Sequence, residues 1–213
     1  MVADRIHLVR HGEVHNPEGV LYGRLPNFGL SDLGHKMAAA AAEEIKSQGR
    51  RITALYCSPL QRTRESARPF TQIFGLDPIT DERFIEPTNV FQGKVLSAGR
   101  LMVQPHRWIH FRNPNRPSWG EPYTDVVARM MEGVLEAANS VKSGDVVIVS
   151  HQLPIWMMHS AVNGKKLPHN PTQRRCTLSS ITSFEIRDGQ LVEVDYREPA
   201  KGLTNQAIDV GAV

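Results

Sequence analysis

Two histidines of the chain each follow a short apolar run. His11 lies in the string LVRHGE, next to Arg10, and His151 lies in the string VVIVSH. A third apolar run leads into the string YCSPLQR, which brings Arg62. A neutral imidazole can act as a nucleophile or carry a proton, and a guanidinium pairs with phosphate or carboxylate oxygens. These residue types predict chemistry on an anion such as a phosphoryl group.

The segments around these residues alternate between apolar, β-branched runs and helical patterns. Ser31 suits the cap of a helix, and Asp188–Gly189 is a strong signal for a hairpin turn. In chain order, we expect a strand over 5–9, a helix over 31–49, a strand over 52–58, a helix over 59–75, a helix over 123–144, a strand over 145–151, a helix over 153–164 and a hairpin over 178–198.

This order predicts an α/β fold, a three-layer sandwich with helices on both faces of a mostly parallel central sheet. The terminal hairpin adds an antiparallel edge. In such sheets ligands bind beyond the carboxyl ends of the strands. We therefore expect His11, His151 and Arg62 to meet there.

The length of 213 residues suits one domain, 1–213. Over about 81–122 the helical and strand periods fade, and Pro, Gly, Asn and Arg accumulate, which predicts a lid-like excursion. The tail over about 199–213 has no clear period and is expected to be loosely packed.

Composition excludes several classes of protein. Hydrophobic residues make up 40% and charged residues 22%, and no apolar run reaches the roughly 20 residues that span a membrane. The N-terminus lacks the apolar segment of a secretory signal, and two cysteines suit reduced thiols, so a cytoplasmic location is expected. The net charge of +3 is scattered without a basic stripe, which predicts no nucleic-acid partner. The sequence does not mark an oligomeric state.

Three strings resemble the signatures of one family, the histidine phosphatase (phosphoglycerate mutase-like) superfamily. The string RHGE with Asn16 and Gly23 resembles the first signature, SPLQRTRESA the second and VVIVSH the third. They occur in the family's order, and the similarity runs from Ile6 to about Tyr196.

The resemblance implies a role for each matching residue. His11 would attack phosphorus and become a phosphohistidine, which water then cleaves. Arg10 and Arg62 would bind the phosphate, His151 would donate to it from the other side, and Asn16 would add a donor. The arginines would supply the positive charge, so no metal is implied.

The resemblance also implies a glutamate as general acid, and here the chain leaves two candidates. Glu86 matches best, because it precedes Gln92–Gly93 as the family pattern requires, although the spacing is one residue short. Glu82 is the competitor. Gly23, Arg24 and Gln152 are predicted to contact the substrate, and Gln152 stands where the family usually has glycine.

Three functions remain open. The first is a metal-independent phosphomonoester hydrolase acting on a small phosphorylated metabolite. The second is a phosphoglycerate mutase, which would use 2,3-bisphosphoglycerate as cofactor, but the chain has YGRLPNFG where such mutases carry a GW-x-D string. The third is a non-catalytic phosphate- or phosphopeptide-binding module, which loss of His11, Arg62 or His151 would indicate. All three are present.

Overall fold

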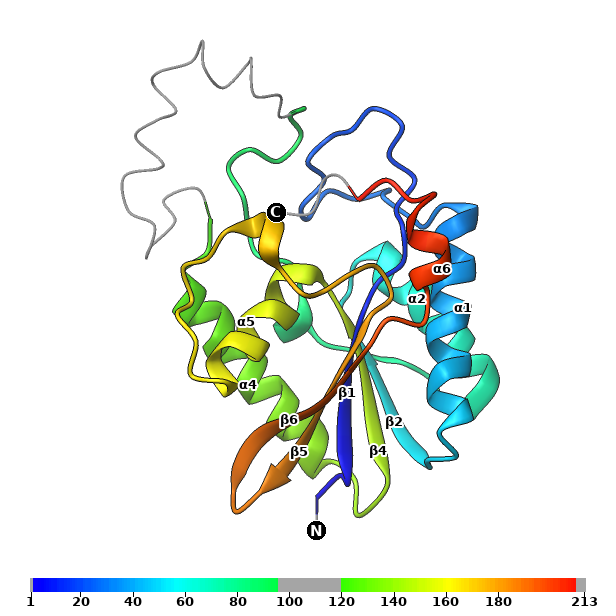
Figure 1. The fold of residues 1–213 in the computed structure, drawn as a ribbon, viewed down its shortest axis with the longest axis vertical. Coiled ribbons are helices and arrows are strands. Elements are labelled where there is room, and N and C mark those ends of the chain that lie inside the picture. The colour runs from blue at the N-terminus through cyan, green and yellow to red at the C-terminus, as the bar shows by residue number, and fades with distance from the viewer. Residues whose placement is uncertain (1, 96–119, 210–213) are drawn as a thin grey trace.

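A single mixed sheet forms the centre of the molecule (Figure 1). The computed structural model describes residues 2–95 and 120–209. The strand order is β3-β2-β4-β1-β5-β6. The strands are β1 (Arg5–Arg10), β2 (Ile52–Cys57), β3 (Ile79–Thr80), β4 (Asp145–Ser150), β5 (Ile181–Arg187) and β6 (Gln190–Arg197).

The first four strands in this order are parallel, and β5 and β6 form the antiparallel edge. The predicted fold class is therefore confirmed. In β4 the side chains of Val146 and Ile148 enter the core on one face, while Val147 and Val149 enter the core on the other. This explains the unbroken apolar run, because a central parallel strand is covered on both sides.

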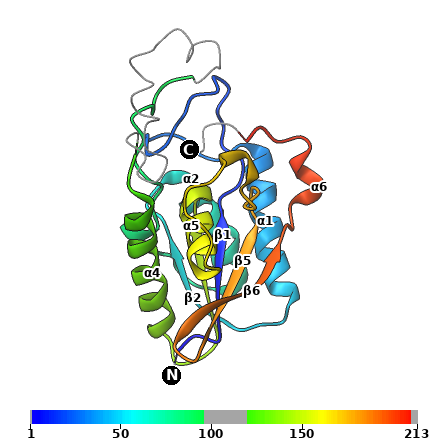
Figure 2. The same ribbon diagram turned by 60° about the vertical axis from the view of Figure 1, so that its left-hand side comes forward.

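Helices cover both faces of the sheet (Figure 2). Helices α1 (Asp32–Ser47) and α2 (Gln61–Phe74) pack on one face, and α4 (Tyr123–Asn139) and α5 (Gln152–Val162) pack on the other. The shorter elements are the 3₁₀ helices η1 (Glu82–Phe84) and η3 (Pro171–Gln173) and the helix α6 (Lys201–Thr204). Within the described ranges, no helix is long and apolar enough to cross a membrane.

Gly12 and Gly34 allow the backbone after β1 to come into direct contact with the backbone at the start of α1. A Cβ atom on Gly12 would lie 2.3 Å from the carbonyl oxygen of Gly34, and one on Gly34 would lie 2.0 Å from the carbonyl oxygen of Glu13. Both distances are far inside van der Waals contact, so only glycine fits at either position. This close approach fixes the backbone that carries His11.

The C-terminal tail, for which loose packing is expected, packs against the core at its start, and the rest of its described residues are half-buried or exposed. Ala200 is buried with Met37 and Leu178, and Leu203 of α6 packs against the same small cluster. This packing could not be predicted from the sequence, because the apolar residues that make the contact are isolated and follow no helical or strand periodicity. Of the expected excursion, residues 96–119 lie outside the described residues.

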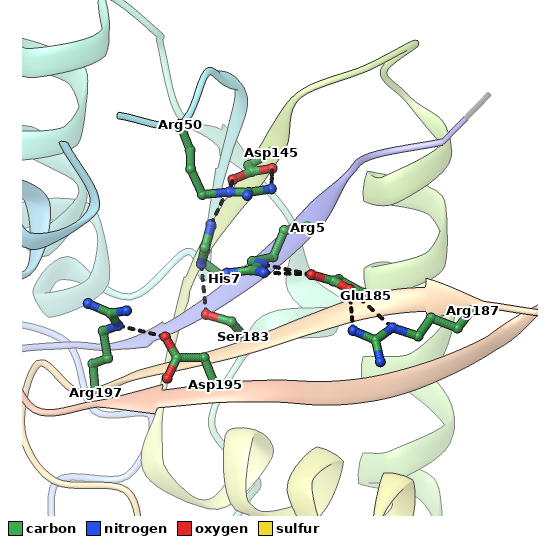
Figure 3. Close-up of polar contacts among 9 residues, drawn as sticks. All are labelled: Arg5, His7, Arg50, Asp145, Ser183, Glu185, Arg187, Asp195 and Arg197. Carbon is green, nitrogen blue, oxygen red and sulfur yellow. Dashed lines mark hydrogen bonds and ion pairs between the residues drawn. The ribbon is translucent and has the colours of Figure 1, made fainter. Parts of the chain in front are cut away.

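A polar network joins β1, β4 and β5 near the amino-terminal ends of β1 and β4 (Figure 3). His7 Nδ1 lies 2.9 Å from Ser183 Oγ, and His7 Nε2 lies 3.1 Å from Asp145 Oδ2. Arg50 donates to both oxygens of Asp145. The three partners of a Ser-His-Asp triad are present, but Ser183 is only 3% exposed and Arg50 neutralises the carboxylate. The network is therefore structural.

The pKa values in this network make its stability depend on pH. Burial raises the pKa of Asp145, but the hydrogen bonds from His7 and Arg50 outweigh burial and hold it below its ordinary value. Burial lowers the pKa of His7, so its imidazole is neutral. The contribution of the Asp145 charge is fully present above the ordinary aspartate pKa of about 3.9 and is lost as the pH falls through the lower value of the folded state.

We predict that Asp145→Asn lowers the free energy of unfolding by about 3 kcal/mol at neutral pH, because it removes a buried carboxylate together with its ion pair to the partly exposed Arg50 and its hydrogen bonds. Asp195→Asn is the control, since Asp195 forms a partly exposed pair with Arg197 on β6 (Figure 3) and should cost under about 0.5 kcal/mol. Urea denaturation measures both. Equal losses in the two variants would contradict the assignment.

Candidate active site

Five ionisable side chains meet beyond the carboxyl ends of β1, β2 and β4. Each is at most 2% exposed. Arg10 and His11 stand at the end of β1, Arg62 in the first turn of α2, His151 directly after β4, and Glu86 shortly after η1. We call these five residues the buried cluster. The arrangement brings together residues that are up to 141 positions apart in the chain.

Every member of the buried cluster has one buried polar atom without a hydrogen-bond partner in residues 2–95 and 120–209. These atoms are Arg10 Nε, His11 Nε2, Arg62 Nε, Glu86 Oε1 and His151 Nδ1. A buried polar atom without a hydrogen-bond partner lowers the stability of the fold by about 1–3 kcal/mol. Five such atoms in one place therefore indicate a ligand-binding site. The donor atoms and the two guanidinium charges suit an anion.

His11 is held in a single tautomer. Its Nδ1 lies 2.7 Å from the carbonyl oxygen of Gly12, and because a carbonyl only accepts, Nδ1 carries the proton. Nε2 is then left with a lone pair. Burial holds the pKa of His11 well below its ordinary value, and the charges of Arg62 and Arg10 lower it further. The imidazole is therefore neutral and able to act as a nucleophile.

His151 faces His11 at a ring-centroid distance of 5.3 Å. Its Nε2 lies 2.8 Å from Ser58 Oγ, and its Nδ1 lies 3.6 Å from Glu86 Oε2. Burial, then Arg62, lowers the pKa of His151 well below its ordinary value. If Ser58 donates to Nε2, Nδ1 carries a proton that points into the buried cluster.

Glu86, and not Glu82, is the carboxylate of the buried cluster. Burial raises the pKa of Glu86, and the charges of Arg62 and then Arg174 oppose this rise. A raised pKa favours the protonated carboxyl, which a general acid requires. Glu82 lies in η1 on the surface. The shortened spacing in the sequence therefore does not move the carboxylate out of the site.

Arg10 donates hydrogen bonds to two groups, the backbone carbonyl of Cys176 and the carboxylate of Asp209 in the C-terminal tail. Its NH1 donates to the Cys176 carbonyl oxygen at 2.7 Å, and NH1 and NH2 donate to the two oxygens of Asp209 at 2.8 and 2.5 Å. The Nε edge of the guanidinium lies opposite this pair. Sequence reasoning missed Asp209, because a lone aspartate 199 residues from its partner gives no signal.

Arg62 is held from behind by the loop after β1. Its NH2 donates to the Gly23 carbonyl oxygen at 2.8 Å, and its Cζ lies 4.8 Å from the centre of the Tyr22 ring. Gly23 has φ +42°, and a Cβ there would lie 2.6 Å from Gln92 Oε1. In the structure Gly23, predicted to contact the substrate, supports the arginine.

The remaining predicted residues lie around the buried cluster. Arg24 Nε donates to the backbone carbonyl of Glu86 at 2.5 Å and so holds the loop of the carboxylate. Asn16 bonds to the backbone of Val20 through both of its side-chain groups. Gln152 accepts a hydrogen bond from Arg174, a residue that the sequence showed only as part of a basic pair. The phosphate contact of Asn16 and the substrate contacts of Arg24 and Gln152 stay predictions.

The donor set of the site is cationic and imidazole-rich. Within the described part of the chain, no group of three or more His, Cys, Asp or Glu side chains is placed to hold a metal ion. Two arginines with a neutral imidazole can draw a phosphoryl group to the lone pair of His11 and stabilise the charge on its oxygens.

Comparison with known proteins agrees with this chemistry. Residues 6–199 match the histidine phosphatase superfamily (branch 1). The chain is 45% identical over 197 residues to "Uncharacterized protein Rv0525" of Mycobacterium tuberculosis. The aligned region covers 92% of this chain and 96% of that protein. The chain is 29% identical over 164 residues to "Phosphoserine phosphatase 1" of Hydrogenobacter thermophilus, and this alignment covers 75% of this chain and 76% of that protein.

Solved structures share the fold. The mycobacterial glucosyl-3-phosphoglycerate phosphatase Rv2419c superposes with a TM-score of 0.73 at 22% identity, over 92% of this chain and 98% of that chain. At this identity the likeness concerns the fold alone.

We predict that Arg62→Gln raises the pKa of His11, because it removes the cation that most disfavours the imidazolium form. Arg64→Gln is the control, since Arg64 lies on the same helix but is exposed to solvent. An NMR titration of the His11 imidazole measures both variants. An unchanged pKa in Arg62→Gln would show that burial and Arg10 keep His11 neutral without Arg62.

Proposed function

The chain belongs to the histidine phosphatase superfamily (branch 1), and from this premise we propose that it is a metal-independent phosphomonoester hydrolase acting on a small phosphorylated metabolite. The observation that carries the proposal is the buried His11, whose Nδ1 donates to the Gly12 carbonyl so that its unpartnered Nε2 keeps the lone pair, while burial and the charges of Arg62 and Arg10 lower its pKa. We propose Arg10 and Arg62 as the phosphate ligands and Glu86 as the general acid.

In the first step, Nε2 of His11 forms a bond to phosphorus as the bond from phosphorus to the leaving oxygen breaks. Glu86 gives its proton to that oxygen, so the leaving group departs as an alcohol. Arg10 and Arg62 offset the charge on the other phosphoryl oxygens, and His151 Nδ1 donates to one of them. The product is a phosphohistidine.

In the second step, water attacks phosphorus from the side that the leaving group has vacated. The Glu86 carboxylate now accepts the proton of the water, and the bond from phosphorus to His11 Nε2 breaks. Inorganic phosphate leaves, and Glu86 is again protonated. One carboxyl group thus serves both steps, which fits its raised pKa.

A mutase would return the phosphoryl group of His11 to a second hydroxyl of a bound acid and would use 2,3-bisphosphoglycerate as cofactor. The segment after the first signature favours the hydrolase, because it has YGRLPNFG where mutases of the family carry a GW-x-D string. The ring of Tyr22 packs against the guanidinium of Arg62, and Arg24 donates a hydrogen bond to the backbone carbonyl of Glu86. The segment therefore positions two members of the buried cluster. A binding module without catalysis would not need a carboxyl group beside the imidazoles.

A screen of phosphorylated metabolites in the presence of EDTA tests the proposed function. Phosphate release and the conversion of 3- to 2-phosphoglycerate are scored separately. Phosphate release that survives chelation supports the hydrolase, whereas isomerisation without release supports the mutase. Inactivation by EDTA with recovery on added Mg²⁺ or Zn²⁺ would contradict a metal-independent mechanism.

We predict that His11→Ala abolishes turnover and the covalent intermediate, because it removes the nucleophile. Stopped reactions with a ³²P-labelled substrate should give an acid-labile label on the wild type and none on the variant, and circular dichroism checks that the variant is folded. Equal labelling of both proteins would show that another residue attacks phosphorus.

We predict that Glu86→Gln slows the hydrolysis of alkyl phosphates by roughly 10²–10⁴-fold, because their poor leaving groups need a proton. Hydrolysis of p-nitrophenyl phosphate should slow far less, since its leaving group needs little help. Glu82→Gln is the matched control, because Glu82 lies on the surface four residues earlier. A similar loss on both substrates in Glu86→Gln would mean that Glu86 only shapes the site.

A further inference from the structure

The loop that carries Glu86 is held by hydrogen bonds to its backbone carbonyl groups. Arg24 Nε donates to the carbonyl oxygen of Glu86 at 2.5 Å, and Arg129 NH1 donates to that of Arg83 at 2.6 Å. Arg24 belongs to the segment after β1 and Arg129 to α4, so the two guanidiniums reach the loop from different parts of the fold. Because a carbonyl is held at each end, the backbone between 83 and 86 has a defined position.

A single carboxylate joins these two arginines. Glu121 Oε1 accepts from Arg129 Nε at 2.7 Å, and Glu121 Oε2 accepts from Arg129 NH2 at 3.0 Å, which is the paired geometry of strong guanidinium–carboxylate contacts. Arg24 NH2 lies 3.4 Å from Glu121 Oε2. The side chains of Arg129 and Glu121 are only 16% and 18% exposed, so salt screens this pair less than it screens surface pairs. We call Arg24, Glu121 and Arg129 the clamp.

Backbone packing places Glu121 beside the loop of Glu86. Gly120 forms an antiparallel bridge with Asn89, and a Cβ atom on Gly120 would lie 2.4 Å from the carbonyl oxygen of Thr88. A residue with a side chain could not approach this backbone so closely. Glu121, the next residue, is therefore fixed between the loop and the start of α4.

The carboxyl group of Glu86 has few contacts of its own. Its Oε2 lies 3.6 Å from His151 Nδ1, which is too long for a hydrogen bond, and its Oε1 has no hydrogen-bond partner among the described residues. The position of the carboxyl group therefore depends on the backbone that carries it.

We propose that Glu121 is a positioning residue, which joins the two arginines of the clamp and so fixes the carboxyl group of Glu86 against the leaving oxygen of the substrate. The inference rests on the proposed function, because only a proton donor needs this placement. Glu121 itself acts through the loop and does not touch the reacting atoms.

The negative charge of Glu121 is needed for this role. Burial lowers the pKa of Arg24, the charge of Glu121 raises it, and the charge of Arg129 lowers it again. Without the carboxylate, two guanidiniums of the same charge would repel each other beside the loop. A glutamine would offer one acceptor oxygen, and its amide group would be a donor that faces other donors.

Steady-state kinetics with two kinds of substrate test the proposal. Glu121→Gln should lower kcat for alkyl phosphates by roughly 10–100-fold, because a shift of about 1 Å in a catalytic group can cost this much. Hydrolysis of p-nitrophenyl phosphate should slow far less, since its leaving group needs little help. KM should change little, because the phosphate ligands stay in place. Arg129→Gln should reproduce the loss, and Glu121→Asp, which keeps the charge, should retain part of the rate.

Glu136→Gln is the matched control. Glu136 lies on α4, and its carboxylate accepts from Arg83 NH1 at 2.6 Å, so this variant also removes a glutamate–arginine pair from the loop. The carbonyl of Arg83 keeps its bond to Arg129, and the ratio of the rates on the two substrates should be unchanged. Equal losses on both substrates in Glu121→Gln, or an unchanged ratio, would overturn the proposal, since a residue that only supports the fold affects both substrates alike.

The double variant Glu86→Gln/Glu121→Gln shows whether Glu121 acts through the acid. Two residues that act through one group are not additive, so Glu121→Gln should add little loss on alkyl phosphates once Glu86 has been replaced. A full additional loss in the Glu86→Gln background would overturn the proposal.

Hydrogen exchange separates this proposal from the proposed function. The Ile85 amide donates to the Glu82 carbonyl oxygen at 3.1 Å, which makes its exchange a measure of the order of the loop. It should exchange faster in Glu121→Gln than in the wild type or Glu136→Gln, and this result supports the clamp even if the wild type releases no phosphate. Equal exchange in all three proteins would overturn the clamp even if the wild type is an active phosphatase.

Discussion

Burial of two guanidinium groups beside two neutral imidazoles is the constraint on which the rest of the structure depends. Arg10 and Arg62 are at most 1% exposed, and each would be unstable there without partners. The fold supplies those partners from behind: Cys176 and Asp209 for Arg10, and the Gly23 carbonyl for Arg62. Because the supports occupy the far edges, both Nε atoms are left for a ligand. Burial, and after it the charge of Arg62, lowers the pKa of both imidazoles and keeps them neutral.

The buried polar groups at the two ends of the sheet differ in whether their hydrogen bonds are satisfied within the protein. At the amino-terminal end, His7 and Asp145 are matched by Ser183 and Arg50, and their hydrogen-bonding capacity is used within the protein. At the carboxyl end, every member of the buried cluster keeps an unmatched atom. A satisfied network stabilises the fold, whereas an unsatisfied one is useful only to a ligand. This contrast identifies the site without reference to any relative.

The sequence predicted the sheet and the buried cluster because both depend on local strings. Apolar runs set the strands, and each motif residue directly follows a strand or opens a helix. The pairing of Asp209 with Arg10 could not be predicted, because the two residues lie 199 positions apart in the chain. Gly23 and Arg24 were predicted from the sequence to contact the substrate, which stays a prediction, but their contacts within the protein could not be predicted. Their contacts run through backbone carbonyls, of Gly23 itself and of Glu86, which no side-chain pattern reveals.

Gln152 shows how the departure from the family pattern fits this chain. A glycine at this position would have no side chain to bridge the two arginines. Gln152 accepts from Arg174 and donates to the Cys176 carbonyl at 3.3 Å, and the same carbonyl accepts from Arg10. The Cys176 carbonyl thus links Arg10 to Gln152, and Gln152 links them to Arg174. The residue that departs from the family pattern therefore takes part in a hydrogen-bonded connection between two arginines.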